Sequence, residues 1–106
     1  NSRRGFLQCY RSEAAFRQEV WLACLLLPTG LWLGQNAVER ALLVGSVIIL
    51  LIVELLNTGI EVVVDRIGVE RHPLSGFAKD VGSAAVFFGL VLLFSTWALI
   101  LWDRLS

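Results

Sequence analysis

Hydrophobic residues fall in three long runs along the chain, at residues 20–34, 41–64 and 81–102. A bilayer core of about 30 Å is crossed by about 20 helical residues. The second and third runs have that length, and the first reaches it when its helix begins a few residues earlier. The pattern predicts three transmembrane helices. Small residues that permit close helix packing occur in the first and third runs: Gly30, Gly34, Ala85 and Gly89.

Polar segments separate the apolar runs. Residues 1–19 interleave arginines with aromatic and aliphatic residues, a spacing typical of a surface helix that leads into the first span. Residues 65–80 are polar and contain Gly68, Pro73 and Gly76, which predicts a loop with Gly76 at a turn. A signal peptide is the alternative for the first run. That run has no small-residue cleavage site and is followed by further spans, so we expect it to be retained.

Composition supports the membrane class. The 106 residues are 57% hydrophobic and 17% charged, with a mean hydropathy of +0.72, which is too apolar for a soluble domain of this size. Nine basic residues balance nine acidic ones, so no nucleic-acid surface is indicated. The positions of Cys9 and Cys24 match neither a disulfide framework nor a metal site, and we expect two free thiols. The fold class is therefore an all-α membrane protein, with residues 1–106 in a single domain.

Lysine and arginine are distributed unevenly between the two sides of the membrane. With three spans, the amino terminus and residues 65–80 lie on the same side, and the opposite side carries only Arg40 and Arg104. The first side holds seven basic residues: Arg3, Arg4, Arg11, Arg17, Arg66, Arg71 and Lys79. Because basic residues stay on the cytoplasmic side, this asymmetry predicts that the amino terminus and residues 65–80 are cytoplasmic.

Polar residues interrupt the second apolar run on one face. At 100° per residue, Glu54, Asn57, Thr58, Glu61 and Asp65 fall within about 100° of arc on a helix. A charged residue at the centre of a transmembrane helix costs about 2.5–3.5 kcal/mol. We therefore expect this face to meet cations, water or other helices rather than lipid. The predicted orientation puts it in the cytoplasmic half of the membrane, within reach of a soluble nucleotide.

Several functions fit this polar face when it is considered alone. It can join helices by hydrogen bonds, although an amide would do so at lower cost than two glutamates. It can also form a proton or cation pathway. With Glu13, which precedes the first span, Glu61 would supply the oxygen ligands that Mg²⁺ accepts when it also holds substrate phosphates. The alternative for Glu13 and Glu19 is that both are solvated charges on a helix surface.

Three blocks of sequence closely resemble the bacterial diacylglycerol kinase family of small trimeric membrane enzymes. They are EAAFRQE (Glu13–Glu19), VELLNTGIEVVVDRIG (Val53–Gly68) and LSGFAKDVGSAAV (Leu74–Val86). The resemblance implies a helical-bundle homotrimer in the bacterial inner membrane, with three spans per subunit and active sites between subunits. It also implies transfer of the γ-phosphate of ATP to the hydroxyl of diacylglycerol, giving phosphatidic acid, with Mg²⁺ as cofactor.

The resemblance implies roles for individual residues. Glu54 matches the general base that acts on the lipid hydroxyl, and Glu13 and Glu61 match the ligands of the ATP-associated metal ions. Asn57 and Lys79 match further catalytic residues. The other implied contacts are those to the nucleotide, at Asp65, Glu70, His72, Lys79 and Asp80, and those to the lipid, at Glu54, Phe16, Glu19 and Ser83.

Two departures from the family pattern affect these implications. Arg71 stands where the family commonly has an aromatic residue, which leaves a stacking contact with adenine open. The chain also begins late relative to the family, so most of the amino-terminal surface helix is expected to be absent or built differently.

The chemistry of the sequence agrees with a membrane lipid kinase. It contains neither a GxxxxGK[ST] loop nor the protein-kinase signature set, so phosphates would be held by metal ions and Lys79. The closest alternative is an undecaprenol (polyprenol) kinase of the same family. A small cation or proton conductor and a noncatalytic assembly factor are alternatives of other classes.

Overall fold

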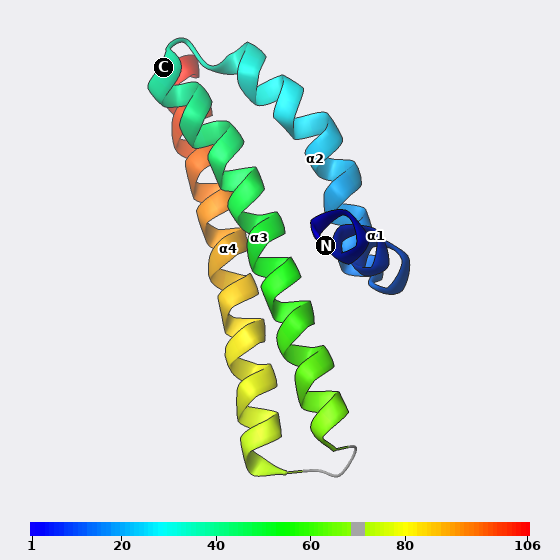
Figure 1. Ribbon diagram of the computed structural model, residues 1–106. Helices are drawn as coiled ribbons and strands as arrows, with labels where there is room; N and C mark the ends of the chain where they lie inside the picture. The colour runs from blue at the N-terminus through cyan, green and yellow to red at the C-terminus, as the bar shows by residue number, and fades with distance from the viewer. Residues whose placement is uncertain (69–71) are drawn as a thin grey trace.

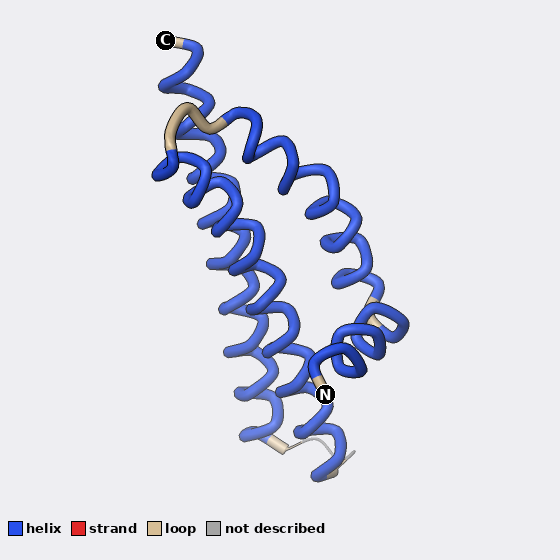
Figure 2. The backbone as a smooth tube through the Cα atoms, turned by 45° about the horizontal axis from the view of Figure 1, so that its top comes forward, coloured by secondary structure: helices blue, strands red, loops and turns tan. Residues whose placement is uncertain are grey.

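The computed structural model describes residues 1–68 and 72–106, and this part of the chain forms four helices. They are α1 (Ser2–Ser12), α2 (Ala14–Leu33), α3 (Ala37–Ile67) and α4 (Pro73–Leu105). Helices α3 and α4 pack side by side as a long antiparallel hairpin, and α2 runs antiparallel to α3 (Figure 1). Helix α1 lies across the amino-terminal end of α2 and also contacts α3 (Figures 1 and 2). The predicted all-α fold class is confirmed.

Two of the helices, α3 and α4, are long and apolar enough to cross a membrane. Helix α2 is shorter, has 20 residues and is not among these candidates, so the first predicted span stays a prediction. Many large apolar side chains point away from the protein interior; Leu25, Trp32, Phe88 and Leu99 are each more than half exposed. An apolar surface of this extent is typical of a protein that contacts lipid.

The predicted loop at residues 65–80 is wrong in extent. Helix α3 continues through Asp65 to Ile67, and α4 begins at Pro73. Gly76 consequently lies inside α4 and not at a turn. The hydropathy pattern marks where a helix becomes polar, whereas the helix itself continues until its hydrogen-bonded turns are interrupted.

Side chains fix where α3 and α4 begin. Asn36 accepts a 2.9 Å hydrogen bond from the Glu39 amide, and the Glu39 carboxylate accepts one of 2.9 Å from the Gln35 amide. This reciprocal arrangement satisfies amides that lack partners at a helix start. At α4, Nδ1 of His72 accepts a 3.1 Å hydrogen bond from the Leu74 amide.

The hydrophobic core lies where α2, α3 and α4 meet. Its buried members are Ala23, Val47, Leu50 and Leu93, with Leu26, Leu27, Leu51, Leu90 and Trp97 packed around them. A Cβ at Gly30 would lie 3.1 Å from Cβ of Leu43, and one at Gly89 would lie 3.3 Å from Cδ1 of Leu50. The predicted close packing at both glycines is confirmed, whereas Ala85 is exposed.

Two arginines hold the carboxyl end of α2. Nε of Arg40 donates a 3.1 Å hydrogen bond to the carbonyl of Leu31, and Arg104 donates one to the carbonyl of Leu33. Gly34 leaves room for the Arg40 side chain, because a Cβ there would overlap it. These cations satisfy carbonyls that have no partner inside the helix.

Candidate active site

Glu13 forms an elbow between α1 and α2. Its backbone is extended (φ −116°, ψ 110°), so it ends one helix and precedes the next. The guanidinium of Arg17 reaches back and donates to the carbonyls of Tyr10, at 2.9 Å, and Arg11, at 3.3 Å. Nε1 of Trp21 donates a 2.7 Å hydrogen bond to the Tyr10 hydroxyl. These contacts hold α1 against α2.

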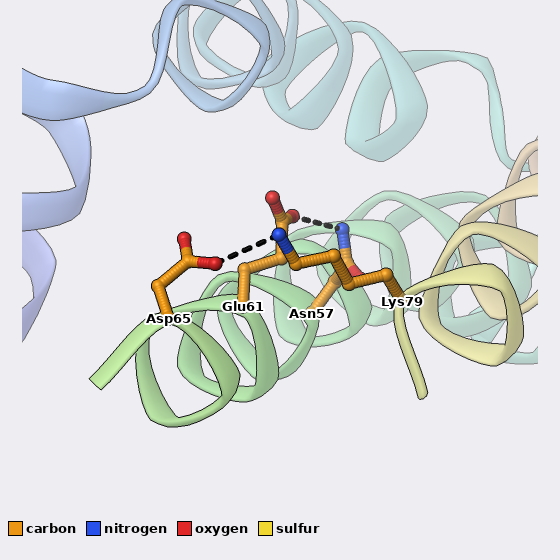
Figure 3. A network of polar contacts seen from close by, with 4 residues as sticks. All are labelled: Asn57, Glu61, Asp65 and Lys79. Carbon is orange, nitrogen blue, oxygen red and sulfur yellow. Dashed lines mark hydrogen bonds and ion pairs between the residues drawn. The ribbon is translucent and has the colours of Figure 1, made fainter. Parts of the chain in front are cut away.

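The polar face of α3 borders a groove of about 420 Å³. Glu54, Asn57, Thr58 and Glu61 all line it, which confirms that these residues share a face. Glu54 is buried, with 8% of its surface exposed, whereas Asp65 at the carboxyl end of the polar face is exposed. Nδ2 of Asn57 donates a 2.9 Å hydrogen bond to Oε1 of Glu61 (Figure 3).

Two other helices complete the walls of the groove. Glu13 and Ala15 line it at the start of α2, and α4 contributes Lys79, Asp80, Ser83 and Val86. Nζ of Lys79 extends across to α3 and forms a 2.7 Å ion pair with Oδ1 of Asp65 (Figure 3). The groove therefore collects most of the predicted site residues, which lie far apart in the sequence.

Gly82 was not among the predicted site residues, yet it places Asn57. A Cβ at this position would overlap Oδ1 of Asn57, so the glycine allows the amide to lie against α4. That oxygen is buried and has no hydrogen-bond partner among the described residues. A buried acceptor of this kind in a polar groove is available to a hydroxyl or a cation. The available signal was a small pair, Gly82 and Ser83, at the start of an apolar run.

Two predicted lipid contacts are not among the residues that line the groove. Phe16 is fully buried and packs edge to face on Phe6, with ring centroids 5.3 Å apart. The carboxyl group of Glu19 lies beside that of Glu54, and its Oε2 is buried without a partner among the described residues. The implied roles of Phe16 and Glu19 stay predictions.

Of the two predicted nucleotide contacts between α3 and α4, the structure describes only His72. His72 caps α4 through its ring nitrogen and does not line the groove. Glu70 and Arg71 lie outside the described residues, so the predicted element formed by Glu70 and His72 is not described as a unit.

Both cysteines are free, as predicted. Cys24 is exposed, whereas Cys9 is buried and its thiol donates to the Thr58 hydroxyl at 3.6 Å. Burial raises the pKa of the Cys9 thiol, and the hydrogen bond to Thr58 lowers it in part. The nearby carboxylates of Glu13 and Glu54 add to the rise in pKa. Cys9 thus joins α1 to the polar face of α3.

The donor set of the groove fits a divalent cation that also contacts phosphate. The described residues contain no group of three or more His, Cys, Asp or Glu side chains able to hold a metal ion alone. Glu13 and Glu61 nevertheless line the same groove. Mg²⁺ is commonly held by one or two carboxylates together with substrate phosphates and water. These residues therefore suit Mg²⁺ that arrives with a phosphate substrate.

Known proteins resemble the chain over most of its length. The family model of prokaryotic diacylglycerol kinase matches residues 1–101. The chain belongs to this family. The diacylglycerol kinase of Pseudomonas aeruginosa is 53% identical over 97 residues, which cover 92% of this chain and 79% of the relative. That of Haemophilus influenzae is 47% identical over 100 residues (94% and 85%), and that of Escherichia coli K12 is 48% identical over 101 residues (95% and 83%).

The prokaryotic diacylglycerol kinase family was identified from three blocks of sequence, and these blocks are the three walls of the groove. The first supplies Glu13 and Ala15, the second supplies the polar face of α3, and the third supplies the residues from α4. The family resemblance is confirmed. The segments that carry it thus lie around one groove.

Proposed function

We propose that this member of the prokaryotic diacylglycerol kinase family is a diacylglycerol kinase, an enzyme that transfers the γ-phosphate of ATP to diacylglycerol and forms phosphatidic acid. Its relatives bear that name at up to 53% identity. The observation that carries the proposal is the groove, which is lined by carboxylate residues from the elbow and from α3 and by a lysine of α4. Phosphoryl transfer needs positioning and neutralisation of charge more than covalent chemistry, and this donor set suits both tasks.

One end of the groove suits the phosphates. Glu13 and Glu61 would hold Mg²⁺, which when bound neutralises charge on phosphate oxygens. The ammonium of Lys79 adds positive charge, and its ion pair with Asp65 holds it toward α3. Asp80 lines the groove beside Lys79 and is our candidate for a further polar contact with the nucleotide.

The other end suits the lipid hydroxyl. Glu54 is the buried carboxylate of the polar face of α3 and would take the hydroxyl proton as general base. The oxygen of that hydroxyl then attacks the γ-phosphorus, and the bond from this phosphorus to the bridging oxygen breaks to release ADP. Asn57 would orient the hydroxyl through its unpartnered Oδ1, and Ser83 borders the same space.

The two ends of the polar face of α3 differ in how deeply their side chains are buried. Glu54 is 8% exposed, whereas the side chain of Asp65 is 63% exposed. The axial distance between these residues is about 16 Å at 1.5 Å per residue. We infer that the lipid enters at the Glu54 end and the nucleotide at the Asp65 end.

We further propose a place in the bacterial inner membrane, with the amino terminus and residues 65–80 in the cytoplasm. The support is the seven basic residues on that side against two on the other. We also propose a homotrimer with active sites between subunits. The support is the resemblance to a family of trimeric enzymes, together with the polar groove along α3 that a single chain leaves partly uncovered.

The test is a phosphoryl-transfer assay on purified protein in mixed micelles. With ATP labelled at the γ-phosphate, we expect labelled phosphatidic acid from diacylglycerol only when Mg²⁺ is present. Undecaprenol, assayed in parallel, tests the polyprenol kinase alternative. Ion flux through proteoliposomes without ATP or a lipid alcohol would instead favour the conductor.

The matched variants are Glu54→Gln and Asp103→Asn. Glu54→Gln removes the base and preserves the shape, so we expect turnover to be abolished while assembly is kept. Asp103 lies near the far end of α4, and its neutralisation should leave the rate unchanged. Full activity of Glu54→Gln would show that the base is assigned wrongly.

A further inference from the structure

The carboxylate of Glu13 depends on the elbow for its direction. A residue before a helix often turns its side chain back to cap the first amides, but Glu13 makes no such hydrogen bond to α2. Glu13 is instead among the residues that line the groove. The backbone of Glu13 is tied to both helices, since its amide donates to the Cys9 carbonyl at 2.9 Å and its carbonyl accepts from the Arg17 amide at 3.0 Å. The angle between α1 and α2 therefore sets where this carboxylate lies.

Arg17 connects the two helices that meet at the elbow. Its guanidinium donates to the carbonyls of Tyr10 and Arg11, in the last turn of α1. The final carbonyls of a helix lack intrahelical partners, and a cation there also interacts favourably with the helix dipole. The side chain thus joins the first turn of α2 to the end of α1, across Glu13.

The other contacts of α1 are made by its side chains, among them the packing of Phe6 on Phe16. The Tyr10 hydroxyl accepts from Trp21, and the Cys9 thiol donates to Thr58 on α3. Both hold side chains of α1 against a neighbouring helix. Arg17 holds the backbone of the last turn itself, directly before Glu13.

We propose that Arg17 is the positioning residue for Glu13: its guanidinium fixes the angle between α1 and α2 and thereby holds the Glu13 carboxylate at the groove. The proposal rests on the proposed function, in which Glu13 and Glu61 hold the Mg²⁺ of the nucleotide. Arg17 itself is not among the residues that line the groove. Its effect is therefore on the metal requirement and not on the reacting atoms.

The first measurement is the dependence of kinase activity on Mg²⁺ concentration. In Arg17→Gln we expect the Mg²⁺ concentration for half-maximal activity to rise about tenfold or more, as is typical when the support of a metal ligand is lost. The maximal rate should recover largely at saturating Mg²⁺. Arg17→Lys keeps a cation at the elbow and should restore part of the shift. Arg3→Gln removes an exposed arginine of α1 and should behave as the parent protein.

The second measurement reports the elbow without any turnover. Spin labels are attached to Ser2→Cys on α1 and Leu25→Cys on α2, in a background with Cys9→Ser and Cys24→Ala. Pulsed electron paramagnetic resonance then gives the distribution of distances between the labels. Labelled subunits are assembled with an excess of unlabelled ones, so that label pairs within one subunit of the proposed trimer dominate. We expect one narrow distribution in the presence of Arg17 and a broader or displaced one in Arg17→Gln. If the glutamine variant does not assemble, the label distances of the folded Arg17→Lys variant are compared with those of the parent instead.

Glu13→Gln separates the two proposals. If it raises the Mg²⁺ requirement while Arg17→Gln changes neither that requirement nor the label distances, Glu13 keeps its role and the positioning proposal is overturned. If Glu13→Gln leaves the Mg²⁺ requirement unchanged, the proposed role of Glu13 fails and the inference about Arg17 fails with it. A rise in both variants, together with altered distances in Arg17→Gln, supports the proposal.

Discussion

Gly82→Ala tests how α4 places Asn57. The new Cβ would overlap Oδ1 of Asn57, so the amide must turn away from α4. The turn would break the 2.9 Å hydrogen bond that Nδ2 donates to Glu61. One methyl group on α4 is thus expected to displace two polar groups of the groove on α3.

The magnitude follows from three opposing contributions. Overpacking costs about 1–3 kcal/mol, and loss of the hydrogen bond costs about 0.5–1.5 kcal/mol. Replacing glycine by alanine inside a helix stabilises the helix by about 1 kcal/mol. The net expectation is a loss of about 0.5–3.5 kcal/mol in the free energy of unfolding. Because misplaced catalytic groups are costly, kcat/KM should fall by roughly 100-fold.

The assay combines unfolding in detergent micelles, followed by circular dichroism, with the phosphoryl-transfer assay. Gly45→Ala is the matched control: a Cβ there meets no atom within 4 Å, so the helix should be unchanged or gain up to about 1 kcal/mol. In an Asn57→Ala background the overlap is gone, and Gly82→Ala should no longer destabilise the fold. A variant as stable and active as the parent, or a penalty that persists beside Asn57→Ala, would refute the overlap.

Three further predictions concern other parts of the chain. Asp65→Asn should leave the free energy of unfolding almost unchanged, because the ion pair of Asp65 with Lys79 is exposed, yet it should raise KM for ATP. An unchanged KM would count against the pair as a nucleotide contact. Leu50→Ala empties a site in the core that is 2% exposed and should cost about 2–5 kcal/mol, and unfolding in micelles that shows a smaller loss would contradict the packing. In Cys24→Ala, alkylation of Cys9 should be slow at neutral pH, because its raised pKa lowers the thiolate fraction and because burial limits access. The alkylation rate should increase only at a higher pH than for a cysteine with an unshifted pKa. Fast labelling of the folded protein by iodoacetamide at neutral pH would contradict that placement.

The polar face of α3 was predictable from spacing, because a helix turns by a fixed angle per residue. Glu54, Asn57, Thr58 and Glu61 line the groove, as their positions in the sequence indicate. The same rule does not specify the partner on α4, since contacts between helices depend on packing. Gly82 was missed for this reason: its importance lies in the side chain that it lacks, and only the position of Asn57 reveals it.

Helix ends were predicted less well than helix cores. Hydropathy changes at Asp65, but the backbone remains helical to Ile67, because exposed helical turns need no apolar environment. The elbow at Glu13 had no hydrophobic signal either. It depends on Arg17 and the carbonyls at the end of α1, a contact that forms only when the chain bends.

The contact between Cys9 and Thr58 fixes the level at which α1 meets α3. From Ala37 to Thr58 the helix rises about 32 Å, close to the thickness of a bilayer core of about 30 Å. The remaining turns of α3, up to Ile67, rise about 13 Å more; they would pass through the headgroups, and only the last of them would reach water. Glu54 would lie about 6 Å inside this boundary, in the outer part of the hydrocarbon core. In the proposed orientation, a lipid alcohol diffusing within its leaflet and a nucleotide arriving from the cytosol would therefore meet near this boundary, each coming from its own phase.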